Sequence, residues 1–257
     1  MKELRIVSLV PSLSELVCDF GLEDSIVGCT NFCISPKSLC KKAKIVGGTK
    51  DPDLGFIAQL KPTHVLVNEE ENRLEDALKL KEFASVIETF PRSPADVPDM
   101  VLELGTELGA ATRGQALADE IVKAIDDLNK LSSKTVRFAY FIWNRPWMVA
   151  AQDTYISRFL ELSGFTNVVV GEERYPQVEL SELEKMGPEI IFFSSEPWPF
   201  RKRDGLQLRD EWPAHPPIHH IDGKLASWYG SSTIEALHQL KKHLLGGENK
   251  LIKPMEF

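Results

Sequence analysis

The strongest constraint on the fold of this chain is a spacing that occurs once in each half. Gly21 lies seven residues before Gly28, and Gly164 lies seven residues before Gly171. Each pair encloses a short segment rich in Val and Ile, and each follows an apolar stretch with helical spacing. A helix that ends at glycine and leads into a short strand is a typical unit of α/β folds.

A second spacing occurs in the same order in both halves. Pro62 lies eight residues before Glu70, and Pro188 lies eight residues before Glu196. Each pair encloses an apolar strand that ends in polar residues. Strands that alternate with helices predict parallel sheets. The fold class is therefore α/β, with two Rossmann-like lobes that carry parallel sheets.

The segment that joins the two halves has apolar residues at helical spacing from residue 98 to residue 131. A continuous helix over this range would be about 50 Å long. Gly105, Gly109 and Gly114 allow a bend within it. We predict an N-terminal lobe over residues 1–97, a single long inter-lobe helix over 98–132 and a C-terminal lobe over 133–257.

Composition excludes several classes of protein. The 257 residues carry a formal net charge of −8, and an acidic chain without clustered Lys and Arg is not expected to bind nucleic acid. No run of about 18 apolar residues is present, so we expect no membrane-spanning helix. The N-terminal residues lack the apolar region of a signal peptide, which predicts a cytoplasmic protein if Met1 is the natural start.

Four cysteines, Cys18, Cys29, Cys33 and Cys40, lie close together in the first half. Their spacing matches no common zinc or haem motif. Ordinary buried thiols are the favoured interpretation, a disulfide is the second and a metal cluster is the third.

Aromatic residues gather in the segments that follow the predicted strands. Ligands of parallel α/β sheets bind beyond the carboxyl ends of the strands. A single aromatic residue could simply pack a loop onto the sheet, but several at corresponding strand ends favour a concave site with aromatic walls. These residues are Phe32, Trp143, Trp147, Tyr175, Trp198, Trp228 and Tyr229.

Other chemistry has less support. His215, His219 and His220 could bind a transition metal, but prolines interrupt the group and a loop that leads into a strand is favoured. The carboxylates 69–71 are typical of a solvated helix start. The chain contains no nucleophile elbow, phosphate-binding loop or dinucleotide fingerprint, so we expect no enzymatic activity.

Six stretches together resemble a known family, the helical-backbone (class III) substrate-binding proteins of ABC importers. That family takes up vitamin B12, iron–siderophores, haem or metal ions, and the resemblance covers nearly the whole chain. The stretches are "RIVSLVPSLSEL", "GCTNFCISP", "IVGGTKDPD", "LKPTHVLVNEEEN", "RYPQVELSEL" and "EIIFFSSEPWPF".

The resemblance implies two α/β lobes joined by one rigid helix, with a ligand held between them. It also implies surface carboxylates that pair with arginines of a membrane permease. By position, permease docking falls on Glu70, Glu71 and Glu75 in the first lobe and on Glu196 or Glu211 in the second. The implied ligand-binding residues are Ser12, Phe32, Asn68, Glu69, Trp143, Arg145, Trp147, Tyr175, Glu196, Trp198, Trp228 and Tyr229.

The resemblance also implies a ligand class and a location. Aromatic faces suit the corrin ring of cobalamin, whereas many iron–siderophore binders rely on arginine, and Arg145 and Arg174 are the only rim arginines in obvious places. Cobalamin or another corrinoid is therefore the expected ligand, with iron–siderophore or haem next. We expect a periplasmic monomer without an intrinsic cofactor, whose partners are a metal chelate and an ABC permease.

Two alternatives stay open at this stage. One is a cytoplasmic enzyme or chaperone that handles a tetrapyrrole or a metal on the same fold. The other is a metal-ion receptor that uses the cysteines or the histidine group.

Overall fold

The computed structural model describes residues 3–131, 134–171 and 173–255, and the side chains of residues 40 and 41 also lie outside the description. The chain divides into two compact units. The first contains the residues up to Pro91, Asp96–Ile121 and Tyr229–Ser232; the second contains Arg92–Ala95, Val122–Trp228 and the residues from Thr233 onward. The predicted lobe boundaries at 97/98 and 132/133 stay predictions.

The first unit is built on a parallel sheet, as the alternation of strands and helices predicted. Its strand order is β3-β2-β1-β4-β5, and each neighbouring pair is parallel. The strands are β1 (Ile6–Ser8), β2 (Ile26–Cys29), β3 (Lys44–Ile45), β4 (His64–Asn68) and β5 (Ser85–Thr89).

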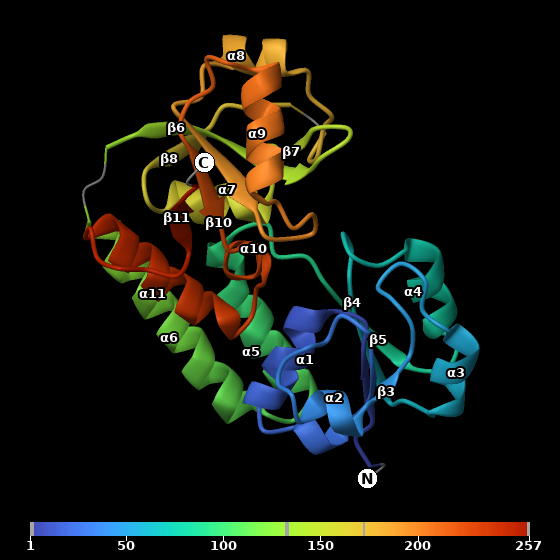
Figure 1. The fold of residues 1–257 in the computed structure, drawn as a ribbon. Helices are drawn as coiled ribbons and strands as arrows, with labels where there is room; N and C mark the ends of the chain where they lie inside the picture. The colour runs from blue at the N-terminus through green and yellow to red at the C-terminus, as the bar shows by residue number, and fades with distance from the viewer. Residues whose placement is uncertain (1–2, 132–133, 172, 256–257) are drawn as a thin grey trace. The chain divides into compact units, whose positions relative to one another are not determined.

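Helices cover both faces of this sheet, and Figure 1 shows α3 and α4 on one side and α1 on the other. Side chains alternate between the faces of a strand, so the apolar strands of a parallel sheet supply two cores. On one face, residues of β1 and β4 pack against α3 (Leu54–Gln59) and α4 (Leu74–Leu80). This core contains Val7, Leu9, Val46, Ile57, Val65, Val67, Ala77 and Leu80.

The first helix, α1 (Pro11–Asp19), begins at Pro11 with Val10 as its N-cap. Proline suits the first turn of a helix because its missing N–H is not needed there. The hydroxyl of Ser14 donates back to the Val10 carbonyl. A short helix, α2 (Leu39–Lys42), precedes β3.

The predicted single helix over 98–132 is two helices, α5 (Val97–Glu107) and α6 (Ala111–Asn129). The turn between them contains Gly109 at a φ of 77°, which a residue with a Cβ adopts only at a cost. The helices then approach closely, because a Cβ placed on Gly105 would lie 3.1 Å from the Cα of Gly114. The three glycines therefore make a corner where the apolar periodicity alone predicted continuity.

The second unit has a mixed sheet, which corrects the prediction that both sheets are parallel. Its strand order is β11-β10-β9-β6-β7, and β8 also pairs with β6. The edge strands β7 (Met148–Ala150) and β11 (Ile252–Pro254) are antiparallel to their neighbours. Only four residues separate β6 (Val136–Trp143) from β7. So short a connection can only form a hairpin, and β7 is therefore antiparallel to β6.

The inner strands of this sheet follow the prediction. The strands β8 (Phe165–Asn167) and β9 (Ile190–Ser194) are parallel to β6, and β10 (Ile218–Ile221) is parallel to β9. The helices of this unit are α7 (Tyr155–Glu161), α8 (Leu180–Met186), α9 (Lys202–Glu211), α10 (Gly223–Ser227) and most of α11 (Ser232–Leu244).

Candidate ligand-binding surfaces

Two tryptophans meet at the carboxyl edge of the second unit's sheet. Trp143 ends β6, and Trp198 lies in the loop after β9; their ring centroids are 5.1 Å apart in an edge-to-face arrangement. Such pairs are favourable beyond the apolar area that they bury. Trp143 is 37% exposed. Within the described residues, the buried indole N–H of Trp198 has no hydrogen-bond acceptor.

A carboxylate and a third tryptophan lie in the same group of loops. The indole Nε1 of Trp228 donates to Oε1 of Glu196 at 2.9 Å, and the hydroxyl of Ser227 lies 3.4 Å from the same oxygen. Burial raises the pKa of Glu196 above its ordinary value. This effect is larger than that of the two hydrogen bonds, which lower the pKa. Lys224, one helical turn before Trp228, places its ammonium 4.3 Å from the centre of that ring.

Trp147 belongs to the core and not to this edge, which corrects its predicted place in the binding site. It is 8% exposed and stacks on Phe193 and Phe200. Its indole Nε1 donates to Oε2 of Glu211 at 2.8 Å. The hairpin from β6 to β7 turns Trp147 onto the face of the sheet, although its sequence spacing resembles that of the edge tryptophans.

The remaining predicted residues of this unit differ in exposure. Arg145 is exposed and adopts a φ of 68°, an uncommon conformation for a residue with a Cβ. Tyr175 is half-buried. Arg174 binds Asp153 across 3.2 Å, so it is held by a local ion pair.

In the first unit, Phe32 is the exposed aromatic residue of the predicted set. It follows β2 and is 54% exposed, and its ring edge lies against Gly48. Ile34, two residues later, is 67% exposed. These two side chains give the carboxyl edge of the first sheet an apolar surface.

Tyr229 and Ser12 lie beneath this edge and are buried. The hydroxyl of Tyr229 is 3.4 Å from that of Thr89 at the end of β5, and it also contacts Ser12. Burial, followed by the nearby carboxylate of Glu71, raises the pKa of Tyr229 well above its ordinary value. The phenol therefore stays protonated, and its role in this structure is to tie the end of β5 to the start of α1.

Asn68 organises the loop after β4. Its side-chain oxygen accepts the backbone N–H groups of Glu70 and Glu71 at 2.8 and 3.1 Å, and its amide donates to the Thr89 carbonyl. At 3% exposure, Asn68 positions the neighbouring residues. Glu69, in the same loop, is exposed.

The predicted docking carboxylates also differ in availability. Glu75 lies in the first turn of α4 with its side chain 67% exposed, 3.6 Å from Arg73. Glu70 and Glu71 are half-buried. In the second unit, Glu196 accepts from Trp228, and both oxygens of Glu211 accept hydrogen bonds, from Trp147 and from Gln207.

The histidine group does not converge on one point. The Nδ1 of His215 is 2.6 Å from the carbonyl of Pro216, and the His219 ring packs edge-on against Phe192. His220 follows on the same strand and so faces the opposite side of the sheet. In the described part of the chain, no three His, Cys, Asp or Glu side chains gather as they would around a metal ion.

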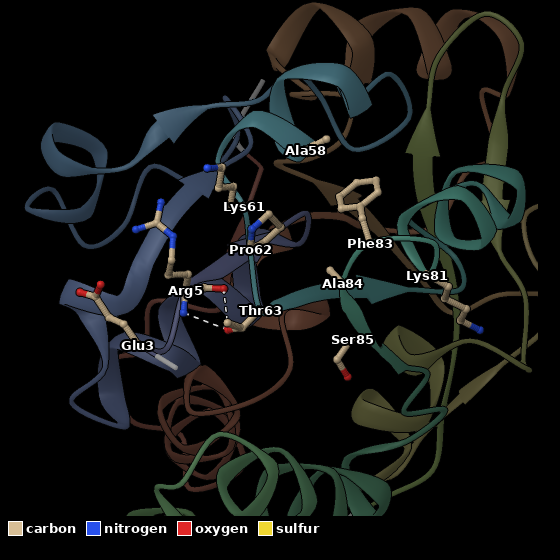
Figure 2. A pocket seen from close by; sticks show the side chains of 10 residues that line it. All are labelled: Glu3, Arg5, Ala58, Lys61, Pro62, Thr63, Lys81, Phe83, Ala84 and Ser85. Atoms are coloured by element: carbon tan, nitrogen blue, oxygen red, sulfur yellow. Dashed lines mark hydrogen bonds between the residues drawn. The ribbon is translucent and has the colours of Figure 1, made fainter. Parts of the chain in front are cut away.

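A groove of about 750 Å³ lies at the opposite, amino edge of the first sheet. Figure 2 shows it beside the hydrogen bonds between Arg5 and Thr63. Its floor contains Phe83 and Ala84, just before β5. Because parallel α/β sheets bind ligands at their carboxyl edges, we do not assign the ligand to this groove despite its size.

Three residues at the carboxyl edges were absent from the predicted set, namely Ile34, Lys224 and Ser227. Lys224 lies in α10 and Trp228 is the C-cap residue four positions later, a spacing that brings side chains together, so this pair could have been found from the sequence once α10 was recognised. The exposure of Ile34 depends on the loop conformation, and no sequence pattern indicates it.

The chain matches the family model described as "Periplasmic binding protein" over residues 6–216. The chain belongs to the periplasmic binding protein family. This confirms the family resemblance stated from the sequence. None of the described helices has both the length and the apolar character needed to cross a bilayer.

Individual relatives have low sequence identity to this chain, but their alignments cover most of it. The chain is 25% identical over 255 residues to the uncharacterized ABC transporter substrate-binding lipoprotein YvrC of Bacillus subtilis, covering 93% of this chain and 79% of the relative. It is 23% identical over 194 residues to a vitamin B12-binding protein of Vibrio cholerae, covering 74% and 70%. The periplasmic heme-binding protein RhuT from Roseiflexus shares the fold, with a TM-score of 0.81, 19% identity and coverage of 95% and 98%.

Proposed function

We propose that this periplasmic binding protein is the substrate-binding component of an ABC importer and that it binds a bulky metal chelate, with cobalamin as the first candidate. The observation that carries the proposal is the aromatic edge of the second unit, where Trp143 packs on Trp198 and Trp228 binds Glu196. Flat aromatic faces and a few polar groups suit a large macrocycle. The names of the relatives add support, since they include vitamin B12- and heme-binding proteins.

The charges at this edge favour a corrinoid over an anionic siderophore. Among the described residues, the ammonium group of Lys224 lies over the ring of Trp228. It also lies near the carboxyl group of Glu196. An anionic chelate would be repelled by the carboxylate of Glu196, whereas the amide groups of a corrin ring can donate hydrogen bonds to it.

The permease would dock through Glu75. Its side chain is 67% exposed and lies in the first turn of α4. Exposed charges of this kind act on the encounter rate and are screened by salt. The location that follows from this proposal is outside the cytoplasmic membrane.

Titration of the purified protein with cyanocobalamin, haemin and ferric citrate tests the ligand proposal. We expect tryptophan fluorescence to fall with cobalamin at a Kd of roughly 1 μM or tighter. Trp143→Ala should weaken binding about tenfold or more, because it removes a stacking face from the centre of the surface.

The matched control is Phe83→Ala, which removes a similarly exposed aromatic ring, 40% exposed, at the amino edge of the first sheet. It should leave the Kd unchanged. If a folded protein shows no quenching with any of the three chelates at tens of micromolar, the proposed function is wrong. Equal weakening by both variants would show that the ligand does not use the aromatic edge.

A further inference from the structure

Two cysteines meet at the carboxyl edge of the first unit's sheet. Cys29 is the last residue of β2 and is fully buried, and Cys33 is 3% exposed. The backbone N–H of Cys33 donates to the carbonyl of Thr30 at 3.1 Å, which closes a tight turn between them. The two thiols are hydrogen-bonded to each other. The turn therefore brings two sulfur atoms into contact.

Hydroxyl groups surround the sulfur of Cys33. The Oγ of Ser14, on α1, lies 3.1 Å from it, and the Oγ1 of Thr30 lies 3.3 Å from it. Donors around a sulfur favour its ionised form. The hydrogen bond with Cys29, helped by those with Ser14 and Thr30, lowers the pKa of Cys33 to about 6 against the opposing effect of burial.

Cys18 shows the opposite behaviour and identifies Cys33 as the reactive member of the group. Burial, followed by the nearby carboxylates of Glu23, Asp19 and Glu15, raises the pKa of Cys18 to about 12. A thiol that stays protonated is a poor nucleophile, and the thiolate is the reactive species. At neutral pH, oxidation should therefore begin at Cys33.

We propose that Cys29 and Cys33 are a peroxide-reactive pair that forms a disulfide across the turn. The Cys33 thiolate attacks one oxygen of a hydroperoxide; an S–O bond forms, the O–O bond breaks, and the second oxygen leaves with a proton as water or an alcohol. The sulfur of Cys29 then attacks the sulfur of Cys33. An S–S bond forms, the S–O bond breaks, and the hydroxide takes up the Cys29 proton as water. Two electrons pass from the sulfurs to the peroxide.

The disulfide would act on the apolar surface that Phe32 gives to the carboxyl edge of the first sheet. It closes a ring over residues 29–33, and Phe32 is the exposed aromatic residue of that ring. A ring of five residues restricts the backbone of the turn and hence the position of Phe32. The thiol chemistry itself does not depend on the identity of the ligand, so it can fail or succeed independently of the proposed function.

The test uses the full chain with Cys18→Ser and Cys40→Ser, which leaves only the proposed pair. The reduced protein is treated with hydrogen peroxide, alkylated and analysed by mass spectrometry. We expect an intact mass about 2 Da lower, no alkylation, and a cross-linked peptide that joins Cys29 to Cys33. A gain of about 32 or 48 Da on Cys33 with Cys29 still alkylated would overturn the proposal, and so would two thiols that stay unreacted.

Ser14→Ala tests the hydroxyl that contacts the Cys33 sulfur. Loss of one donor to the thiolate should slow the oxidation about fivefold at neutral pH, and the rates of variant and parent should converge at high pH, where Cys33 is ionised in both. Thr30→Val should act in the same direction. Ser157→Ala, a buried serine of the second unit, is the control and should change nothing. Equal slowing at every pH would show that Ser14 only shapes the turn and would contradict its proposed effect on the thiolate.

Discussion

The indole of Trp228 donates a 2.9 Å hydrogen bond to the half-buried carboxylate of Glu196. Glu196 follows β9, Trp228 ends the short helix that follows β10, and these two strands are parallel. Parallel pairing places both loops at the same edge of the sheet, and this is why residues 32 positions apart in the sequence can meet. The contact joins a carboxyl group to the ring edge of a tryptophan at the surface where we propose that the ligand binds.

Glu196→Gln should raise the stability of the ligand-free protein at neutral pH. Burial raises the pKa of Glu196 in the folded protein above its unfolded value, so the native state holds the proton more tightly and stability falls as pH rises through that interval. The amide keeps an acceptor for Trp228 and removes the buried charge. We expect Tm to rise by about 2 °C at pH 7, with a smaller difference at pH 4. A lower Tm at pH 7 would show that the ionised form stabilises the fold.

Low pH should reduce the stability of the second unit because two of its half-buried histidines become protonated on unfolding. Burial lowers the pKa of His219, and the charge of His243 lowers it further; burial also lowers the pKa of His243 itself. The unfolded chain therefore binds these protons first, so stability is complete above pH 6.5 and declines as pH falls below it.

His219→Gln should flatten this decline in the free energy of unfolding, measured by urea denaturation between pH 7.5 and pH 5. His238→Gln, on the exposed side of α11, is the matched control. An unchanged slope in the His219 variant would assign the acid sensitivity to other groups.

Two tryptophans near the end of β6 should respond differently to truncation. Trp147→Ala should cost about 3 to 5 kcal/mol of stability, because it leaves a cavity against Phe193 and Phe200. Trp143→Ala should cost about 1 kcal/mol or less in the free protein, since its ring is already partly exposed. Chemical denaturation measures both values. Similar losses for the two variants would mean that Trp143 is also a core residue.

Two helical glycines of the first unit should give opposite results. Gly105→Ala places a Cβ 3.1 Å from the Cα of Gly114 and 3.4 Å from the carbonyl oxygen of Ala110, so it should destabilise the corner between α5 and α6 by about 1 to 3 kcal/mol. Gly55→Ala meets only the Asp53 side chain at 3.5 Å and should stabilise α3 by about 0.5 to 1 kcal/mol. A neutral Gly105 variant would show that the corner can open.

Docking to the permease should depend on Glu75. Glu75→Ala should reduce stimulation of transporter ATPase activity by the loaded protein, and the loss should shrink as salt increases, since the interaction is between exposed charges. Glu82→Ala removes another exposed carboxylate of the same unit and should have no effect. If Glu82→Ala reduces ATPase stimulation as strongly, the effect is one of net charge.

Much of the fold could be predicted because its signals are local. The strands β1, β2, β4, β6 and β9 each coincide with a short apolar run, whereas β8 ends at Asn167, before the three valines 168–170, and β10 contains two histidines. The antiparallel edges were missed because neither edge strand has a distinctive pattern, and their direction depends on which neighbour they reach. The corner at Gly109 was allowed but not required by the sequence, because the close approach of Gly105 and Gly114 is a contact between two helices.

The candidate site was predicted only in part, for a related reason. The position of a residue after a strand says that it lies near an edge of the sheet, and this sufficed for Phe32, Trp143, Trp198 and Trp228. It does not say how much of the side chain remains exposed. Asn68 and Ser12 satisfy these positions and yet are buried.

The amino-acid sequence by itself determined the alternation of strands and helices, since hydrophobic period and turn residues act within a few positions of the chain. Tertiary structure alone decided that Trp147 belongs to the core, that Glu196 meets Trp228, and that Cys33 gains a hydroxyl from α1. Each of these contacts joins segments that are distant in the chain or turned by a hairpin. Their energies depend on packing between whole elements, which no local pattern records.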